Sequence, residues 1–260
     1  MPHELPAHTS ASQLACYARC PRQYRYRYVE GREAESKNPA LAVGTAVHGA
    51  VAWWFESRKV GHEPDHAAAL RILRADLGAA LASPDYRVDG NEAATLLAEA
   101  EKLLALFLAH LDDLEVVTVE ERFELHLLHP DTGEPLPRPL VGFLDLVLAD
   151  GTIVELKTAA RAYGTNELVT NLQFAAYRYV AREHERPDVR LVSLVKTKAP
   201  KVQEVSLRPA TSMSAEWFVR VVAEVEAAIA AGVFPPTPGM SCATCDYRAP
   251  CFGLGVDAAA

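Results

Sequence analysis

The stretch VGFLDLVLADGTIVELKT, residues 141–158, holds two apolar segments that meet at Asp150 and Gly151. Short runs rich in Val, Ile and Leu on either side of a glycine-containing turn predict a β-hairpin. The length of the turn decides which side chains face each other, because successive residues of a strand point to opposite faces.

Two turn lengths are compatible with this hairpin. A two-residue turn at Asp150 and Gly151 would send Asp145 and Glu155 to opposite faces. A three-residue turn over 149–151, with Gly151 at positive φ, would set the two carboxylates directly opposite each other. We predict the second register because it separates apolar from charged side chains. The predicted apolar face holds Leu144, Leu146, Leu148, Val154 and Leu156, and the other face holds Phe143, Asp145, Glu155 and Lys157.

This register would bring two carboxylates and a lysine to one point, since opposed residues have β-carbons about 5 Å apart. Oxygen ligands at such a spacing suit Mg²⁺ or Mn²⁺. A bound ion of this kind can polarise a phosphate and lower the pKa of a water molecule, while Lys157 can orient that water or stabilise developing negative charge. The competing interpretation is an ordinary surface hairpin, because Glu-x-Lys is a common pattern.

The flanking sequence places this hairpin in an α/β fold. Helical periodicity comes first, strands begin at residue 116, and a helix then separates the hairpin from two further strands. This order predicts a mixed β-sheet flanked by helices, behind a helical N-terminal lobe. The expected helices cover residues 40–58, 92–112, 166–184 and 214–231, and the last two strands lie near 190–197 and 202–207.

Three parts of the chain follow from this pattern. Residues 1–115 are expected to form an N-terminal segment with a basic, aromatic strip and the helical lobe. Residues 116–234 would form the core, and residues 235–260 a C-terminal segment that carries three cysteines.

Composition excludes few classes of protein. The chain has 260 residues, 50% of them hydrophobic and 23% charged, which is ordinary for a soluble enzyme. The N-terminus lacks a basic segment followed by an apolar one, and no apolar run reaches membrane-spanning length. We therefore expect a cytoplasmic protein with no membrane partner.

Charge is distributed unevenly along the chain. The net charge is −8, which disfavours indiscriminate coating of nucleic acid. Residues 19–32 nevertheless contain five arginines and one glutamate, so this stretch carries +4 and the remainder −12. The strip from Arg22 to Arg27, which includes Tyr24 and Arg25, could neutralise phosphates and stack on bases of a single strand. Alternatively, the tyrosines of an amphipathic strand or helix pack inward.

The cysteines suggest a bound metal. Cys242, Cys245 and Cys251 offer three thiolates and Cys20 a fourth, a set that suits either tetrahedral zinc or an iron-sulfur cluster. Cys16 lies one helical turn before Cys20 and competes for the fourth position. We favour Cys20, because it stands directly before Pro21, where a helix must stop.

Four short motifs occur in an order that resembles the RecB-like branch of the PD-(D/E)XK nuclease family. They are Gly44-x-x-x-His48, Gly142-x-x-Asp145, Glu155-x-Lys157 and Gln173-x-x-x-Tyr177.

The resemblance implies a restriction-endonuclease-like core and a role for each motif. His48, Asp145 and Glu155 would hold Mg²⁺ or Mn²⁺, with Asp145, Glu155 and Lys157 forming the catalytic set. Gln173 and Tyr177 would contact DNA beside the active site.

A finer resemblance concerns the cysteines. Cys20 before Pro21 and Arg22, together with the C-terminal trio, is similar to the iron-sulfur subgroup of these nucleases, which includes the CRISPR-associated exonucleases. This likeness implies a 4Fe-4S cluster in a C-terminal iron-sulfur region, with zinc as the alternative.

The expected function is that of a metal-dependent DNA exonuclease that hydrolyses phosphodiester bonds from the ends of single strands. Its setting would be DNA repair or CRISPR spacer acquisition, with a repair helicase or a CRISPR integrase as partner. The alternative is a noncatalytic DNA-binding or scaffold subunit that keeps the fold. The intact set of Asp145, Glu155 and Lys157 favours the enzyme.

Overall fold

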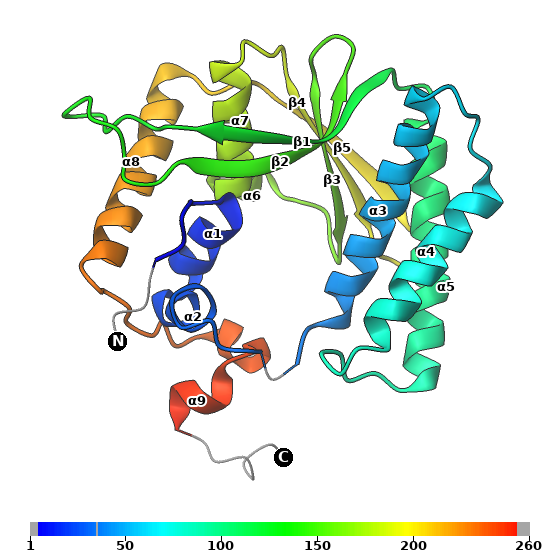
Figure 1. Ribbon diagram of the computed structural model, residues 1–260, viewed down its shortest axis with the longest axis horizontal. Helices are drawn as coiled ribbons and strands as arrows, with labels where there is room; N and C mark the ends of the chain where they lie inside the picture. Colours follow the sequence, from blue (N-terminus) through cyan, green and yellow to red (C-terminus); the bar gives the residue numbers. More distant parts are fainter. Residues whose placement is uncertain (1–4, 35, 254–260) are drawn as a thin grey trace.

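The computed structural model describes residues 5–34 and 36–253, in which one mixed sheet carries helices on both faces (Figure 1). The sheet has five strands in the order β1-β2-β3-β4-β5. Pairing is antiparallel except between β3 and β4, which run parallel. The strands are β1 (Val116–Leu125), β2 (Leu140–Leu148), β3 (Ile153–Ala159), β4 (Val189–Val195) and β5 (Lys201–Leu207).

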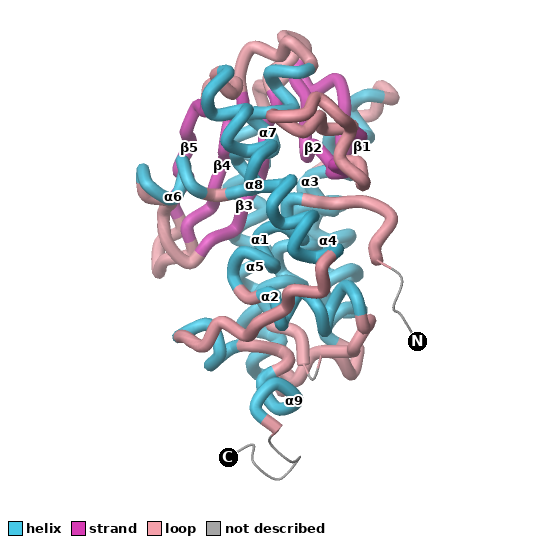
Figure 2. Tube along the Cα trace, turned by 90° about the vertical axis from the view of Figure 1, so that its left-hand side faces the viewer, coloured by secondary structure: helices cyan, strands magenta, loops and turns pink. Residues whose placement is uncertain are grey.

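Helices fill the segments before, between and after the strands. Those before the sheet are α1 (Ala11–Arg19), α2 (Pro21–Tyr24), the π-helix η1 (Arg25–Val29), α3 (Pro39–Lys59), α4 (His66–Leu81) and α5 (Gly90–Leu111). Those that follow are α6 (Thr165–Thr170), α7 (Leu172–Glu183), α8 (Ser212–Ala230), the 3₁₀ helix η2 (Met240–Thr244) and α9 (Arg248–Phe252). Figure 2 shows the strands toward one end of the molecule and α9 at the other.

The predicted register of the β2–β3 hairpin is confirmed. Leu146 pairs with Val154, which sets Asp145 opposite Glu155. The turn is the three-residue type, because the N–H of Gly151 donates to the Leu148 carbonyl and Gly151 has φ 87°. Glycine adopts this conformation without the steric cost that a side chain would add.

The predicted division of the hairpin into two faces is wrong at Leu144. Leu146, Leu148, Val154 and Leu156 pack together with α3, α4 and α5, but Leu144 belongs to the core on the opposite side of the sheet. The change occurs where Glu120 of β1 takes the unusual φ of 49° between two regular pairs with β2. A left-handed residue interrupts strict alternation, so apolar pattern alone assigned Leu144 to the wrong side.

Two hydrophobic cores hold the sheet between its helical layers. On one face, the long helix α3 buries Val43, Val47 and Val51 completely against α4, α5 and the sheet. On the other face, α1, α7 and α8 cover β2 and β3. The predicted helices at 40–58 and 92–112 therefore correspond to α3 and α5, and they form a layer on the sheet.

The single helix predicted at 166–184 is two helices. Asn171 separates α6 from α7 with an extended backbone, and its side chain accepts the N–H groups of Gln173 and Phe174 as the N-cap of α7. Asparagine at such a position satisfies donors that the first turn leaves unpaired. The break lets α7 start a new direction beside β3.

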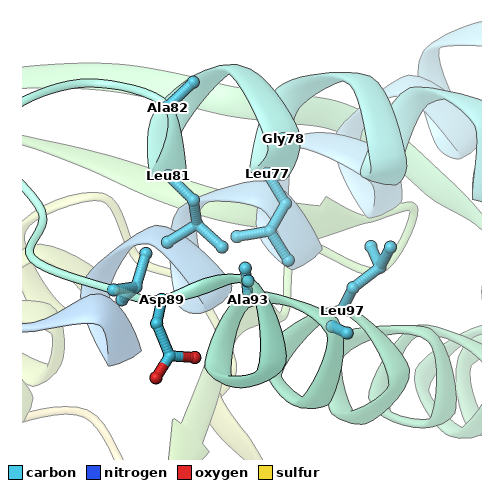
Figure 3. A pocket seen from close by; sticks show the side chains of 10 residues that line it. Leu77, Gly78, Leu81, Ala82, Asp89, Ala93 and Leu97 are labelled. Atoms are coloured by element: carbon cyan, nitrogen blue, oxygen red, sulfur yellow. The ribbon is translucent and has the colours of Figure 1, made fainter.

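An apolar cavity of about 360 Å³ lies between α4 and α5, away from the hairpin (Figure 3). Leu77, Leu81 and Leu97 line it. Asp89, the charged residue at its edge, caps α5 by accepting the N–H groups of Asn91 and Glu92. In the described part of the chain, no helix is long and apolar enough to span a membrane.

Gly142 is required by close packing. An ideal β-carbon there would lie 2.5 Å from Cζ of Phe123, whose ring is buried. Gly142→Ala should therefore lower the free energy of unfolding, by about 1–3 kcal/mol as is typical of overpacking. Gly78→Ala is the matched control, because a β-carbon at this position inside α4 meets nothing within 4 Å; it should stabilise the protein by about 0.5–1 kcal/mol. Urea unfolding measures both, and changes of equal sign would contradict the packing argument.

Candidate active site

Asp145 occupies the point where β2 and β3 stop pairing. Backbone pairing between the two strands ends at Leu146 and Val154. Beyond this pair, Oδ2 of Asp145 accepts the backbone N–H of Leu156 at 2.8 Å. The carboxylate thus takes the place of the β2 carbonyl that would accept this N–H if the strands stayed paired. Its other oxygen, Oδ1, lies 3.6 Å from Nδ1 of His48.

His48 reaches Asp145 from α3, on one side of the hairpin. Gly44 lies one turn earlier on the same helix, and an ideal β-carbon there would be 3.4 Å from Oγ1 of Thr158 on β3. That distance is an ordinary van der Waals contact, so α3 packs directly against β3 at this turn. The first predicted motif thus positions a histidine on a helix that packs against the strand.

Glu155 is almost fully buried, with 1% of its surface exposed. Its Oε1 atom forms an ion pair with Nζ of Lys157 and accepts Nε2 of Gln173 at 3.2 Å. Its Oε2 atom is buried and has no hydrogen-bond partner within the described chain. A buried carboxylate oxygen without a partner is costly, and such exceptions call for an explanation.

Gln173 and Tyr177 of α7 support Glu155 from the second side of the hairpin. The Gln173 amide also donates to the Tyr177 hydroxyl at 3.1 Å, and that hydroxyl donates to the Phe143 carbonyl at 3.2 Å. Tyr177 is only 6% exposed. These contacts position Glu155, and the DNA contact expected of Gln173 and Tyr177 stays a prediction.

The environment pushes the pKa values of the two carboxylates in opposite directions. Burial, reinforced by the charge of Asp145, raises the pKa of Glu155 to about 7. Burial would also raise the pKa of Asp145, but hydrogen bonding to His48 and the charges of His48 and Lys157 lower it overall. Burial alone would lower the pKa of Lys157, but the charges of Glu155 and Asp145 outweigh burial and raise the pKa overall. Such divergence is typical of functional sites.

The donor set fits a hard divalent ion. Asp145 and Glu155 supply oxygen ligands, and the unpartnered Oε2 of Glu155 is a free acceptor. Among residues 5–34 and 36–253, no three His, Cys, Asp or Glu side chains are gathered tightly enough to hold a metal ion by themselves. This partial set suits Mg²⁺, which typically binds through one or two carboxylates and completes its shell with water and substrate phosphate.

Sequence reasoning missed Glu120. This exposed residue lines the same small hollow as His48 and Asp145, and its φ of 49° is rare for a residue other than glycine. In the sequence it is one acid in an alternating strand, which looks like an ordinary solvent-facing position. The unusual φ, which a sequence pattern does not reveal, turns it toward the site.

Comparison with family models decides the classification. The model of the PD-(D/E)XK nuclease superfamily matches residues 8–252, a span that includes all four motifs and all of the cysteines. The chain belongs to the PD-(D/E)XK nuclease superfamily. A search of curated proteins found no match.

One solved structure shares this fold. A protein from Eubacterium rectale that is provisionally named an exonuclease has a TM-score of 0.58 and 15% identity, with coverage of 93% of this chain and 88% of that one. At this identity the likeness shows the fold alone. A structure named SSO0001 matches with a TM-score of 0.45 and 13% identity over 97% of this chain and 89% of that one.

A large cleft adjoins the carboxylates of this nuclease. Its volume is about 940 Å³, and His48, Lys157 and Thr158 are among the residues that line it. Residues of α1, α2 and η1, of the first half of α3, and of the C-terminal stretch 241–246 also line it; in Figure 1, α1 and α2 lie across from α3. The cleft therefore offers a substrate path to the site.

The basic strip is helical, and the base stacking predicted for its Tyr24 is wrong. Tyr24 is 1% exposed and packs in the core, so its ring cannot stack on bases. Nε of Arg22 donates to the Phe234 carbonyl at 2.9 Å, and Arg25 pairs with Glu30 at 2.6 Å. These three residues do not line the cleft. The inward packing of the tyrosines, which the sequence left as an alternative, is what the structure adopts.

The four cysteines predicted as cluster ligands line one cavity of about 240 Å³. Cys20 stands between α1 and α2 with an extended backbone, and the other three come from the C-terminal segment. Cys16, the competing residue, is 2% exposed and packs with Tyr17, Tyr24 and Ile229. It does not line this cavity.

The burial of Glu155 predicts a pH-dependent stability in metal-free protein. Its pKa rises from 4.5 to about 7 on folding, so the folded state holds the proton more tightly. The contribution of Glu155 to the free energy of unfolding is then fully present below pH 4.5 and is lost as the pH rises through 7, by roughly 3 kcal/mol at most. Glu155→Gln should lack this decline. Urea unfolding in EDTA across this range measures the difference, and parallel pH profiles for the two proteins would contradict the assignment.

Proposed function

We propose that this nuclease is a metal-dependent DNA exonuclease acting on the ends of single strands. The observation that carries the proposal is the buried, unpartnered Oε2 of Glu155 beside Asp145. A buried carboxylate oxygen without a hydrogen-bond partner is suited to bind a metal ion. In the alternative, a noncatalytic subunit, the unfavourable burial of the Glu155 carboxylate would serve no function.

His48, Asp145 and Glu155 would hold Mg²⁺ or Mn²⁺. The ion would supply Lewis-acid polarisation of the scissile phosphate. Lys157 lies in the cleft and is paired with Glu155, so its ammonium is placed to stabilise negative charge that develops on the phosphate. Gln173 fixes Glu155 through Oε1 and leaves Oε2 available.

The preference for DNA ends is the one that the sequence resemblance to the CRISPR-associated exonucleases implies.

Linear single-stranded DNA labelled at one end should be degraded with Mn²⁺ or Mg²⁺ and remain intact in EDTA. Glu155→Gln and Lys157→Ala should each lower the rate by about 100-fold or more. Glu216→Gln, at an exposed position on α8, is the control and should cleave normally. Near-normal cleavage by either site variant would reject the proposed site.

Circular single-stranded DNA of the same composition should survive under these conditions. Cleavage of the circle at the linear rate would reject the exonuclease assignment while leaving the nuclease site intact. Binding of DNA without cleavage under either metal would favour the noncatalytic alternative.

We further propose that Cys20, Cys242, Cys245 and Cys251 hold a 4Fe-4S cluster, as in the iron-sulfur subgroup that the sequence resembles. Their common cavity supports this ligand set. Such a cluster would tie residue 20 to the C-terminal segment and thereby constrain both. A setting in DNA repair or CRISPR adaptation, with a helicase or integrase partner, is consistent with this subgroup.

Cys20→Ser should yield iron-poor, colourless protein of lower stability, because a ligand of the shared cavity is lost. Cys16→Ser should stay brown with normal iron and sulfide, since Cys16 packs in the core outside the cavity. Iron and sulfide analysis of anaerobically purified protein measures both. Loss of iron from Cys16→Ser alone would reverse the assignment, and zinc without sulfide in the wild type would exclude the cluster.

A further inference from the structure

Two arginines of the basic stretch 19–32, Arg19 and Arg27, lie in the substrate cleft. Arg19, near the end of α1, and Arg27, in η1, both line the wall opposite α3 and both are exposed. Gln23 lies in the same wall, and its Oε1 atom accepts Nε of Arg19 at 3.1 Å. Arg22 and Arg25, from the same helical run, bind Phe234 and Glu30 instead.

Contacts within this wall hold both cations in place. Gln23 is 9% exposed and bonds Arg19 directly. The guanidinium of Arg27 lies 5.2 Å from the ring centroid of Tyr28, a cation–π distance. These contacts already restrict the rotation of the two arginine side chains. Binding a ligand therefore costs less conformational entropy than it would with freely rotating side chains.

The rest of the cleft is compatible with a polyanion. The facing wall presents Asn38, Gly44 and Thr45, which are uncharged, and Lys157 also lines the cleft. Two acids also line the cleft: Glu120 beside the proposed metal site and Asp246 next to Cys245. The cleft thus carries the cations Arg19, Arg27 and Lys157 against these two acids, a balance that favours phosphates.

We propose that Arg19 and Arg27 are positioning residues that bind successive phosphates of the single strand while its end lies at the carboxylates. This inference rests on the proposed function, and it replaces the contacts first expected of Arg22, Tyr24 and Arg25. Guanidinium groups suit the role because their planar fork binds phosphate through paired hydrogen bonds. The cleft volume of about 940 Å³ is large enough for a short stretch of one strand.

The test is binding of fluorescent oligo(dT) in EDTA, where no cleavage occurs, over a series of salt concentrations. Each phosphate contact contributes about 0.7 to the slope of log K against log salt for a single strand. The double variant Arg19→Ala with Arg27→Ala should therefore bind more weakly and flatten that slope by about 1.4. Arg25→Ala, which removes a charge from the same helical run outside the cleft, should leave the slope unchanged.

Two further measurements separate phosphate binding from a structural effect. Lysine at both positions should restore most of the slope, because the charge returns, and the urea midpoint of the alanine variant should match that of Arg25→Ala. With Mn²⁺, the alanine variant should raise KM for linear DNA and keep kcat at saturation close to that of the wild type.

The outcomes distinguish this inference from the proposed function. A slope in the double alanine variant equal to that of Arg25→Ala would overturn the inference, whether or not the protein cleaves DNA. A flattened slope in a protein that cleaves no DNA with either metal would uphold the two phosphate contacts and reject the exonuclease. Absence of any binding by the wild type would overturn both.

Discussion

One hydrogen bond organises the active site: the Asp145 carboxylate accepts the backbone N–H of Leu156 where β2 and β3 part. Because a side chain satisfies this donor, the ladder can end at Leu146 and Val154 without leaving a buried N–H unpaired. The parted strands make room for Glu155 on one side and His48 on the other. Both helical layers of the fold thus meet the hairpin at the same place, α3 through His48 and α7 through Gln173.

Glu155 is the residue whose burial in this arrangement is energetically unfavourable. A carboxylate that is 1% exposed loses most of its hydration, and Lys157 and Gln173 compensate at one oxygen only. The two apolar cores on either face of the sheet stabilise the fold enough to tolerate the other oxygen. Active sites commonly sacrifice local stability in this way.

The sequence pattern predicted the sheet, the long helices and the hairpin register correctly, because apolar periodicity and a glycine turn determine these features locally. It did not predict features that depend on contacts between residues far apart in the sequence. Leu144 packs in the other core, next to the point where Glu120 of β1 has a positive φ, and Tyr24 packs against distant residues such as Phe234. Arg19 and Arg27 gain their place in the cleft only because the α1–η1 run lies across from α3, a relation that no local pattern encodes.

The central claim is that Asp145 and the free oxygen of Glu155 bind a divalent metal. An anomalous difference map from a crystal soaked in Mn²⁺ tests it most directly. The account predicts a peak at about 2.1–2.2 Å from Oε2 of Glu155 and from an oxygen of Asp145, adjacent to His48, a distance typical of a small divalent ion bound by oxygen. A map in which Mn²⁺ binds elsewhere, with Oε2 of Glu155 still unpartnered, would contradict it.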